Sequence, residues 1–172
     1  LDVAQSLRGQ FELQNHIIWV KSISIGDDTV GHFKPITSDR FLNNNFEHVF
    51  HFTKNGRSLL NRLGIGVPFK DKSNISRWGH TRDRRCRGNT WFIPYKTVRS
   101  KTQKFDHPAT FPVELAEMCI GVHGSMGGRV LDPFLGTGTT LVAAQRMGLQ
   151  AVGIEIDPLY AQTARDRLEA EN

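Results

Sequence analysis

Two glycines and an acid near the end of the chain have the residue types and spacing best suited to ligand chemistry. Gly136 and Gly138 lie in the stretch Gly-Thr-Gly-Thr-Thr, and Glu155 follows 17 residues after Gly138. A glycine turn between a strand and a helix lets a ligand approach the backbone, because no Cβ stands in the way. A carboxylate at the tip of the adjacent strand can accept hydrogen bonds from both hydroxyls of a ribose. The pattern therefore predicts a pocket for a nucleoside-containing ligand.

A dinucleotide is one ligand that uses such a site. Its fingerprint has a third glycine, which lets the helix pack closely, and it places a pyrophosphate at the helix N-terminus. In this chain Leu141 stands three residues after Gly138, where that glycine is expected. The dinucleotide interpretation is therefore weakened.

The elements that must position these residues occupy the last zone of the chain, residues 106–172. The pattern there predicts helix, strand, helix, strand, helix. The expected elements are a helix from Pro112, a strand at Val130-Leu131, a helix ending at Gly148, a strand over Ala151–Glu155, and a helix that begins at Pro158 with Asp157 as its cap. A right-handed crossover would make the two strands parallel neighbours, with the glycine turn and the acid at one edge.

The first zone, residues 1–53, contains two runs of β-branched and aromatic residues. His16–Val20 is a continuous run, as expected of a strand covered on both faces, and His48–Phe52 predicts a second strand. The connection between these runs is rich in Gly, Asp and Asn. We therefore expect it to be a loop.

The middle zone, residues 54–105, stands out by its charge. Lys54 to Lys104 holds 14 Lys and Arg against two acids, a net charge of +12, whereas the rest of the chain has a net charge of −7. A short helix is expected over residues 59–63, ending at Gly64, and about 40 residues with little periodicity follow it. Because aromatic residues rather than acids interleave with these cations, we favour a nucleic-acid partner over a merely solvated loop.

Within this zone, Arg82–Trp91 combines several arginines with an asparagine. Arginine can bind guanine or phosphate and asparagine can bind adenine, but most hydrogen bonds to DNA reach the backbone. The candidate DNA-binding residues are Arg82, Arg84, Arg85, Arg87 and Asn89. Trp78 and Trp91 could stack on a displaced base, although for Trp91 we favour a small local core.

Metal and nucleophile chemistry find little support. The chain has no Cys-x-x-Cys pair and no His-Glu-x-x-His helix, and His48 and His51 should lie on opposite faces of their strand. We therefore expect no metal site. Cys86 lies among arginines, but the sequence places no histidine partner beside it.

Length and composition are those of one globular domain, with 172 residues, 38% hydrophobic and 23% charged. The longest apolar run, around Ile17–Val20, is far shorter than the roughly 20 residues that cross a bilayer, so we expect no membrane partner. Cys86 and Cys119 cannot form a disulfide framework, and no secretory leader pattern is present. We therefore expect the protein to work in a reducing cytoplasm.

Several segments resemble motifs of the DNA amino-methyltransferases, which use S-adenosylmethionine to methylate the exocyclic nitrogen of adenine or cytosine. Residues 132–140, Asp-Pro-Phe-Leu-Gly-Thr-Gly-Thr-Thr, and residues 153–157, Gly-Ile-Glu-Ile-Asp, are similar to their motifs I and II. Residues 107–112, His-Pro-Ala-Thr-Phe-Pro, resemble motif X, and residues 11–21 and 46–54 resemble the strand motifs beside the target-base pocket. This order resembles the circularly permuted β group of the family.

The resemblance implies an α/β architecture, the Rossmann-like fold of S-adenosylmethionine-dependent methyltransferases, circularly permuted, with a mixed, mostly parallel sheet and an irregular basic insert. Residues 1–53 would form the target-base-pocket half, residues 54–105 the target-recognition segment and residues 106–172 the cofactor-binding half. The implied partner is double-stranded DNA with a flipped target base. A cognate restriction endonuclease is a further candidate partner, and the implied location is a prokaryotic cytoplasm.

The resemblance also implies roles for single residues. Gly136 and Gly138 would let the cofactor approach, Glu155 would bind its ribose and Ile156 would cover its adenine. Asp157 is explained equally well by a contact to the adenine edge and by helix capping. The other implied cofactor residues are Phe134 beside the adenosine, Asp132 and Thr139 or Thr140 at the methionine portion, and His107, Ala109, Thr110 and Phe111 in motif X over the methionine end.

The chain departs from the family at the catalytic motif, in which an Asp, Asn or Ser precedes Pro-Pro and an aromatic residue. None of its seven prolines are adjacent. In the permuted order this motif comes before the first pocket strand, so we expect the catalytic loop to precede Leu1. We therefore name no catalytic residue and expect the chain to be inactive alone, because positioning of the reacting groups contributes roughly 7–11 kcal/mol.

Two alternatives stay open. The chain could be a catalytically silent module that binds DNA and cofactor, or its basic segment could serve the methylation of RNA. The choice between adenine and cytosine also stays open, because it depends on the absent motif.

Overall fold

The computed structural model of the chain describes residues 2–31, 37–77, 79, 81–94, 110–124 and 128–171. The chain divides into two compact units, Leu1–Pro94 and Tyr95–Asn172. None of the helices in the described ranges has the length and apolar character that a membrane span requires.

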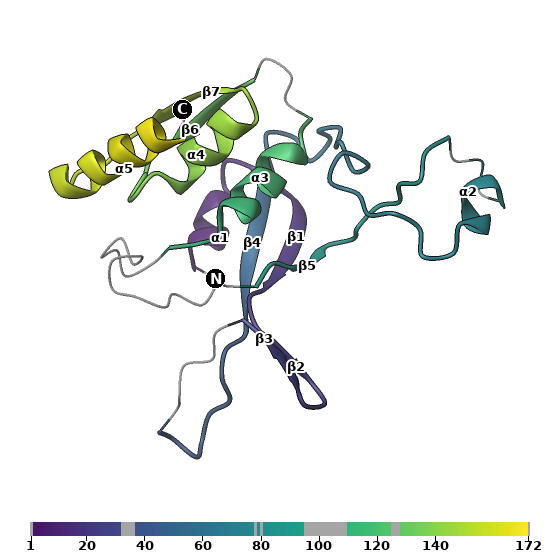
Figure 1. Ribbon diagram of the computed structural model, residues 1–172. Helices are drawn as coiled ribbons and strands as arrows, with labels where there is room; N and C mark the ends of the chain where they lie inside the picture. Colours follow the sequence, from purple (N-terminus) through teal and green to yellow (C-terminus); the bar gives the residue numbers. More distant parts are fainter. Residues whose placement is uncertain are drawn as a thin grey trace. The chain divides into compact units, whose positions relative to one another are not determined.

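The first unit is built around the three-stranded sheet β4-β1-β5 (Figure 1). Its central strand β1, Glu12–Val20, pairs antiparallel with β4, Phe46–Thr53, and parallel with β5, Thr90–Phe92. A short helix α1, Asp2–Leu7, precedes β1. Both strands predicted in the first zone are confirmed, each with longer bounds than expected.

The expectation that β1 is covered on both faces is wrong for the described residues. Ile17 and Trp19 are buried on one face, whereas His16 on the other face is exposed and Ile18 is half-buried. β1 and β4 are antiparallel, and antiparallel pairs commonly leave one face solvated. The indole N–H of Trp19 donates to the carbonyl of Ile93 at 2.9 Å, which ties β1 to the segment after β5.

A hairpin lies between β1 and β4, where the sequence predicted only a loop. β2, Ile23–Ile25, and β3, Asp28–Val30, pair antiparallel across a two-residue turn. Gly26 in this turn has a φ of 59°, the left-handed conformation that tight hairpin turns require. The strands have three residues each, which is too short for an alternating pattern to show.

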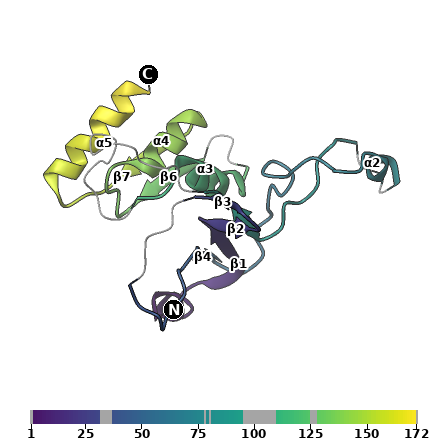
Figure 2. The same cartoon turned by 60° about the horizontal axis from the view of Figure 1, so that its bottom comes forward.

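The segment between β4 and β5 leaves the sheet as a long loop that carries α2, Ser73–Arg77 (Figures 1 and 2). The helix predicted over residues 59–63 does not form. Instead, the carbonyl and the side-chain Oδ1 of Asn61 both accept from the N–H of Gly64 at 3.0 Å. Asparagine competes with helix formation through local hydrogen bonds of this kind.

The second unit contains the parallel pair of β6, Arg129–Asp132, and β7, Gln150–Gly153. The connecting helix α4, Thr139–Arg146, packs against this pair, and α3, Val113–Gly121, and α5, Pro158–Ala170, pack against α4 (Figure 2). The predicted order of helix, strand, helix, strand, helix and the parallel pairing are both confirmed.

The core of the second unit lies between α4 and its neighbours. Val142, Ala143 and Ala144 of α4 are at most 1% exposed. Leu131 of β6 and Val152 of β7, which are register partners, remain 64% and 62% exposed on the other side of the strands. The apolar face of α4 therefore fixes the strand pair from one side only, within the described residues.

Candidate functional site

The glycine turn and Glu155 lie at the same edge of the β6–β7 pair. Asp132 and Gly153, the last residues of the two strands, are partners in the parallel register. Beyond them, the N–H of Ile154 donates to the carbonyl of Asp132, and the N–H of Leu135 donates to the carbonyl of Ile154, both at 2.9 Å. The segments that carry the turn and the acid therefore leave the sheet side by side, as the sequence predicted.

Glu155 directs its carboxylate at the glycine turn. Oε2 accepts a hydrogen bond from the N–H of Gly136 at 2.7 Å, and Oε1 accepts one from the N–H of Asp157 at 2.9 Å. The residue is half-buried. A carboxylate offers about four acceptor positions, so it can bind its own backbone and the hydroxyls of a ligand at the same time.

The two glycines of the turn both have left-handed backbone conformations, with φ of 55° at Gly136 and 84° at Gly138. A Cβ on Gly138 would lie only 2.8 Å from the Cβ of Ala164 in α5. Gly138 is thus required for close packing of the turn against α5, a reason that the sequence did not reveal. Its predicted role in ligand approach stays a prediction.

Helix α5 also supplies a residue that the sequence pattern did not indicate. The Nη1 of Arg167 donates to the carbonyl oxygen of Thr137 at 2.6 Å, inside the glycine turn. Arg167 follows Ala164 by three residues and therefore lies on the same face of α5. Only the contact between Ala164 and the turn identifies this face, so the sequence alone had no signal for Arg167.

Four other predicted residues surround the turn. Phe134 and Ile156 are 88% and 98% exposed, so their side chains are accessible to a ligand. The Oδ1 of Asp132 accepts from the N–H of Phe134 at 3.0 Å. Asp157 caps α5, because its Oδ1 accepts from the N–H of Leu159 at 2.8 Å. The capping interpretation of Asp157 is confirmed, and its contact to the adenine edge stays a prediction.

Four of the remaining predicted cofactor residues lie near the starts of α4 and α3. Thr139 is buried and Thr140 is half-buried at the first two positions of α4. Thr110 and Phe111 directly precede the segment that leads into α3. His107 and Ala109 lie outside the described residues.

Two of the predicted DNA-binding arginines bind the protein itself. The Nη1 of Arg84 donates to the carbonyl of Gly66 at 2.7 Å, and the Nε of Arg87 donates to the carbonyl of Ile65 at 2.9 Å. Charge-assisted bonds to backbone carbonyls are stronger than neutral ones. Arg84 and Arg87 therefore tie their own segment to residues 65–66. Both segments belong to the loop between β4 and β5, which we call the basic loop.

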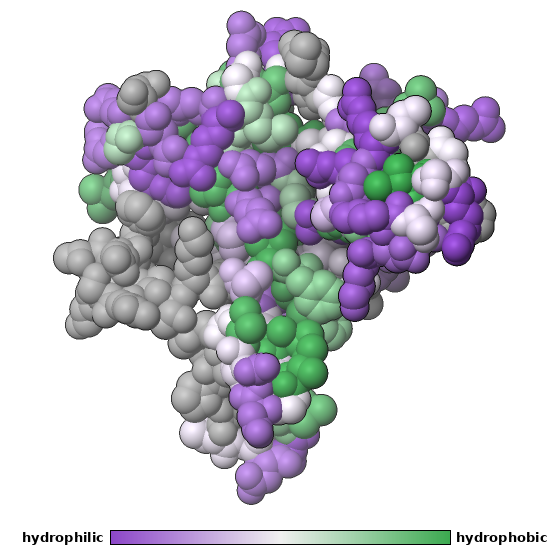
Figure 3. All heavy atoms as spheres, turned by 45° about the vertical axis from the view of Figure 1, so that its right-hand side comes forward, coloured by the Kyte–Doolittle hydropathy of each residue, from purple (hydrophilic) through white to green (hydrophobic). Residues whose placement is uncertain are grey.

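The other three predicted DNA-binding residues differ in their contacts. Asn89 donates through Nδ2 to the carbonyl of His16 at 2.9 Å, which ties it to β1. Arg82 and Arg85 are exposed. Arg85 reaches the adjacent carbonyl of Cys86 at 3.4 Å, and the side chain of Arg82 has no hydrogen-bond partner in the described part of the chain. Hydrophilic side chains dominate the surface around α2 (Figure 3).

An ion pair and a buried indole order the rest of the basic loop. Asp83 binds Lys72 and accepts from the N–H of Phe69, and these contacts hold the pKa of the Asp83 carboxyl below its usual value. Trp91 is 1% exposed and donates to the carbonyl of Gly88 at 3.0 Å. The local-core interpretation of Trp91 is confirmed, whereas Trp78 lies outside the described residues.

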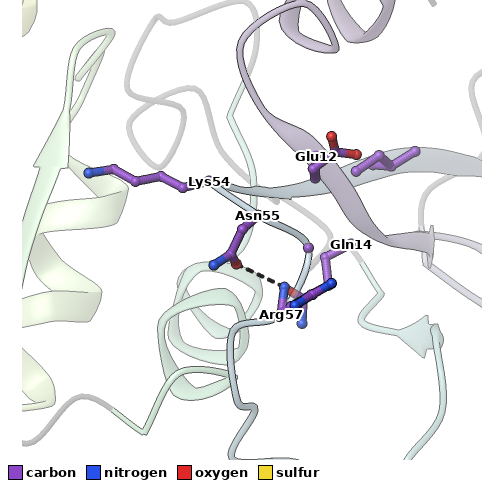
Figure 4. Close-up of a pocket in the computed structure, with 7 residues that line it drawn as sticks. Glu12, Gln14, Lys54, Asn55 and Arg57 are labelled. Carbon is purple, nitrogen blue, oxygen red and sulfur yellow. Dashed lines mark hydrogen bonds between the residues drawn. The ribbon is translucent and has the colours of Figure 1, made fainter.

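A polar pocket of about 520 Å³ lies where β4 ends beside the start of β1 (Figure 4). Gln14 shapes it, because its Oε1 accepts from Thr53 and from the N–H of Ser58. The lining residues are Glu12, Leu13, Gln14, Lys54, Asn55, Gly56 and Arg57. Figure 4 shows the side chain of Lys54 extending away from Glu12. Lys54 and Arg57 are exposed and contribute to the positive charge of the basic loop.

Histidine side chains of β1 and β4 form hydrogen bonds within the sheet. His48 shares a 2.8 Å hydrogen bond with His16, and His51 accepts one from Asn15 at 3.0 Å on the other face of the strands. The described ranges hold no group of three or more His, Cys, Asp and Glu that could bind a metal ion. Burial raises the pKa of the Cys119 thiol to about 11, which keeps it protonated near neutral pH.

Comparison with known proteins bears on this geometry. Residues 1–166 match the model of the family N6_N4_Mtase, described as "DNA methylase". The chain belongs to this DNA methylase family. Its curated relatives include two type II methyltransferases. M.XycI of Xanthomonas campestris pv. cyanopsidis is 31% identical over 93% of the chain and 45% of the relative. M.SmaI of Serratia marcescens is 35% identical over 71% of the chain and 37% of the relative. The chain thus spans less than half the length of these relatives.

Solved structures of DNA methylases share the fold. The PvuII DNA methyltransferase (cytosine-N4-specific) superposes with a TM-score of 0.70 and 18% identity over 96% of the chain and 55% of that protein. A putative DNA modification methylase from Thermus thermophilus, solved in complex with S-adenosyl-L-methionine, superposes with a TM-score of 0.60 and 29% identity over 98% and 57%. The predicted α/β fold class of S-adenosylmethionine-dependent methyltransferases is therefore confirmed for this member of the family.

Proposed function

We propose that the protein transfers a methyl group from S-adenosylmethionine to the exocyclic amino group of adenine or cytosine in DNA. The observation that carries this proposal is the carboxylate of Glu155, bound to the N–H of Gly136 at the edge of a parallel strand pair. Nucleoside ligands bind α/β folds at this edge, with an acid on the ribose and a glycine turn beside it. The DNA methylase family supplies the substrate class.

The described residues fit the cofactor chemically. Glu155 would accept hydrogen bonds from the ribose hydroxyls, and the exposed faces of Phe134 and Ile156 would cover the adenine. Asp132, Thr139 and Thr140 would hold the methionine portion, and Thr110 and Phe111, with His107 and Ala109, would close over it. When bound, S-adenosylmethionine supplies an activated methyl group on a sulfonium.

The basic loop would bind double-stranded DNA. Arg82 and Arg85 are exposed, and Lys54 and Arg57 line the pocket at the end of β4, so all four can reach phosphates. The target base would have to leave the helix, because its amino group is inaccessible inside a duplex. Residues 54–105 would thus act as the target-recognition segment between a target-base half, residues 1–53, and a cofactor half, residues 106–172.

The order of the motifs supports the permuted arrangement. Strand motifs come first, then the basic segment, then motif X, then motifs I and II. We place the protein in a prokaryotic cytoplasm, with a cognate restriction endonuclease as a partner, because its relatives are type II methyltransferases.

Calorimetry with S-adenosylmethionine tests the proposal. Glu155→Ala removes the carboxylate, and Glu169→Ala removes an exposed acid of α5 as a matched control. We expect binding to the unaltered chain, a loss of at least tenfold in Glu155→Ala, and no change in Glu169→Ala. The loss corresponds to hydrogen bonds with a charged group, each worth about 1.5–3 kcal/mol. Undetectable binding to the unaltered chain, or unchanged affinity in Glu155→Ala, would refute the assignment.

A second candidate function is a catalytically silent module that binds DNA and cofactor. The absence of two adjacent prolines favours it. A radiolabelled methyl-transfer assay with residues 1–172 and duplex DNA tests the silent module. Methylation by the chain alone would exclude it.

A further inference from the structure

Arg167 reaches into the glycine turn from helix α5. Its Nη1 donates to the carbonyl oxygen of Thr137 at 2.6 Å and contacts the hydroxyls of Thr137 at 3.1 Å and Thr139 at 3.3 Å. Thr137 and Thr139 are 3% and 6% exposed. A single guanidinium nitrogen therefore serves three acceptors that water reaches poorly.

The placement of this guanidinium is costly. Arg167 is half-buried, and this burial lowers the pKa of its guanidinium. The nearby Glu171 carboxylate is engaged by Arg146, with bonds of 2.5 and 2.7 Å. A cation in such a place must be compensated by its hydrogen bonds. The acceptors of the glycine turn supply this compensation together with the charge of Glu171.

Two contacts of α5 act on the turn together. Ala164, one helical turn before Arg167, allows Gly138 to approach the helix, since any Cβ on Gly138 would meet Ala164 at 2.8 Å. Arg167 then fixes the carbonyl of Thr137 between the two left-handed glycines. At the start of the turn, Glu155 binds the N–H of Gly136. The peptides of the turn are thus held by two charged side chains from different elements.

We propose that Arg167 is a positioning residue that holds the glycine turn, through Thr137, in the shape that binds S-adenosylmethionine. This inference rests on the proposed function. Arg167 itself does not touch the cofactor; it acts by preorganising the turn, so that binding does not have to order it. Without the guanidinium, the buried carbonyl of Thr137 loses this donor, and the turn samples other conformations before it binds.

The test compares cofactor affinity in four proteins at a temperature where thermal scans show each to be folded. Arg167→Met removes the charge and keeps most of the side-chain length, and Arg167→Lys keeps a charge but loses the planar fork. Arg165→Met is the control, because Arg165 is an exposed arginine of the same helix. At such a temperature, a role in global stability alone leaves the Kd for S-adenosylmethionine unchanged.

We expect the Kd from calorimetry to rise at least tenfold in Arg167→Met, to rise less in Arg167→Lys, and to stay within twofold in Arg165→Met. Unchanged affinity in Arg167→Lys and Arg167→Met would overturn the inference while leaving the proposed function intact. If Arg167→Met does not fold, Arg167→Lys decides alone: a raised Kd supports the inference and an unchanged Kd overturns it. Absence of binding to the unaltered chain and to Arg165→Met would instead refute the proposed function, and the inference with it.

Discussion

A methyl group added at Gly138 should lower the free energy of unfolding for two reasons. Its φ of 84° is left-handed, a conformation that costs an L-residue about 1–2 kcal/mol. Its missing Cβ would also overlap Ala164 of α5. Gly148, after α4, has a φ of 68°, but a Cβ there would meet no described atom within 4 Å. The two glycines therefore separate backbone strain from steric overlap.

We predict that Gly148→Ala lowers the free energy of unfolding by about 1 kcal/mol. Gly138→Ala should lower it by about 3 kcal/mol, because overpacking of a close contact adds roughly 1–3 kcal/mol. Urea denaturation followed by circular dichroism measures both values. Equal losses in the two variants would show that α5 yields to the added methyl group.

The basic loop between β4 and β5 contains the short helix α2, and side-chain bonds to carbonyls of the loop hold other parts of it together. Arg84 and Arg87 bind the carbonyls of Gly66 and Ile65, and a backbone bridge joins Val67 to Arg85. These bonds replace the ladder that a hairpin would provide. Positive charge in this loop thus has two uses, one internal and one directed at solvent.

We predict that Arg87→Met mainly lowers stability, whereas Arg82→Met mainly lowers affinity for DNA. Arg87→Met should lower the free energy of unfolding by about 1.5–3 kcal/mol, since it removes a charge-assisted hydrogen bond. Arg82→Met should leave stability unchanged but weaken binding to a duplex of arbitrary sequence, and reduce the slope of log K against log salt by about 0.9. Denaturation and fluorescence anisotropy across a salt series measure these effects. A weaker duplex affinity in Arg87→Met at full stability would assign it to the DNA surface instead.

The residues proposed to bind DNA and those proposed to bind S-adenosylmethionine belong to different units of the chain. Arg82, Arg85, Lys54 and Arg57 belong to the unit Leu1–Pro94, whereas the glycine turn and its partners belong to Tyr95–Asn172. Each unit has its own sheet in the described residues, β4-β1-β5 in the first and β6-β7 in the second. The two ligands should therefore protect different parts of the backbone.

Hydrogen exchange measured by mass spectrometry checks this separation. We predict that S-adenosylmethionine slows exchange in peptides covering residues 132–140 and 153–157, where amides of the turn face Glu155. A duplex oligonucleotide should instead slow exchange in peptides covering residues 54–89. Protection of the basic loop by S-adenosylmethionine alone would contradict the division.

The sequence by itself determined the second unit and the edge where its strands end. Caps and glycines punctuate that unit, so the order of its elements, the parallel pair and the cap at Asp157 could all be predicted. The position of Glu155 beside the glycine turn followed from that order, because strands that run in parallel end at the same edge. These caps and glycines are local sequence features, and each helix or strand can be recognised from the residues at its own ends.

Only the tertiary structure decided whether the helix at residues 59–63 forms, which face of β1 is buried and what the arginines contact. The helix predicted over residues 59–63 does not form, because Asn61 forms local hydrogen bonds instead. The burial of β1 on one face only depended on its antiparallel partner β4. Arg84 and Arg87 became internal ties, and Arg167 joined the turn through a face of α5 that only its contact with Gly138 defines. An arginine has the same sequence pattern whether it meets a carbonyl of its own chain or a phosphate, and packing between residues distant along the chain makes that choice.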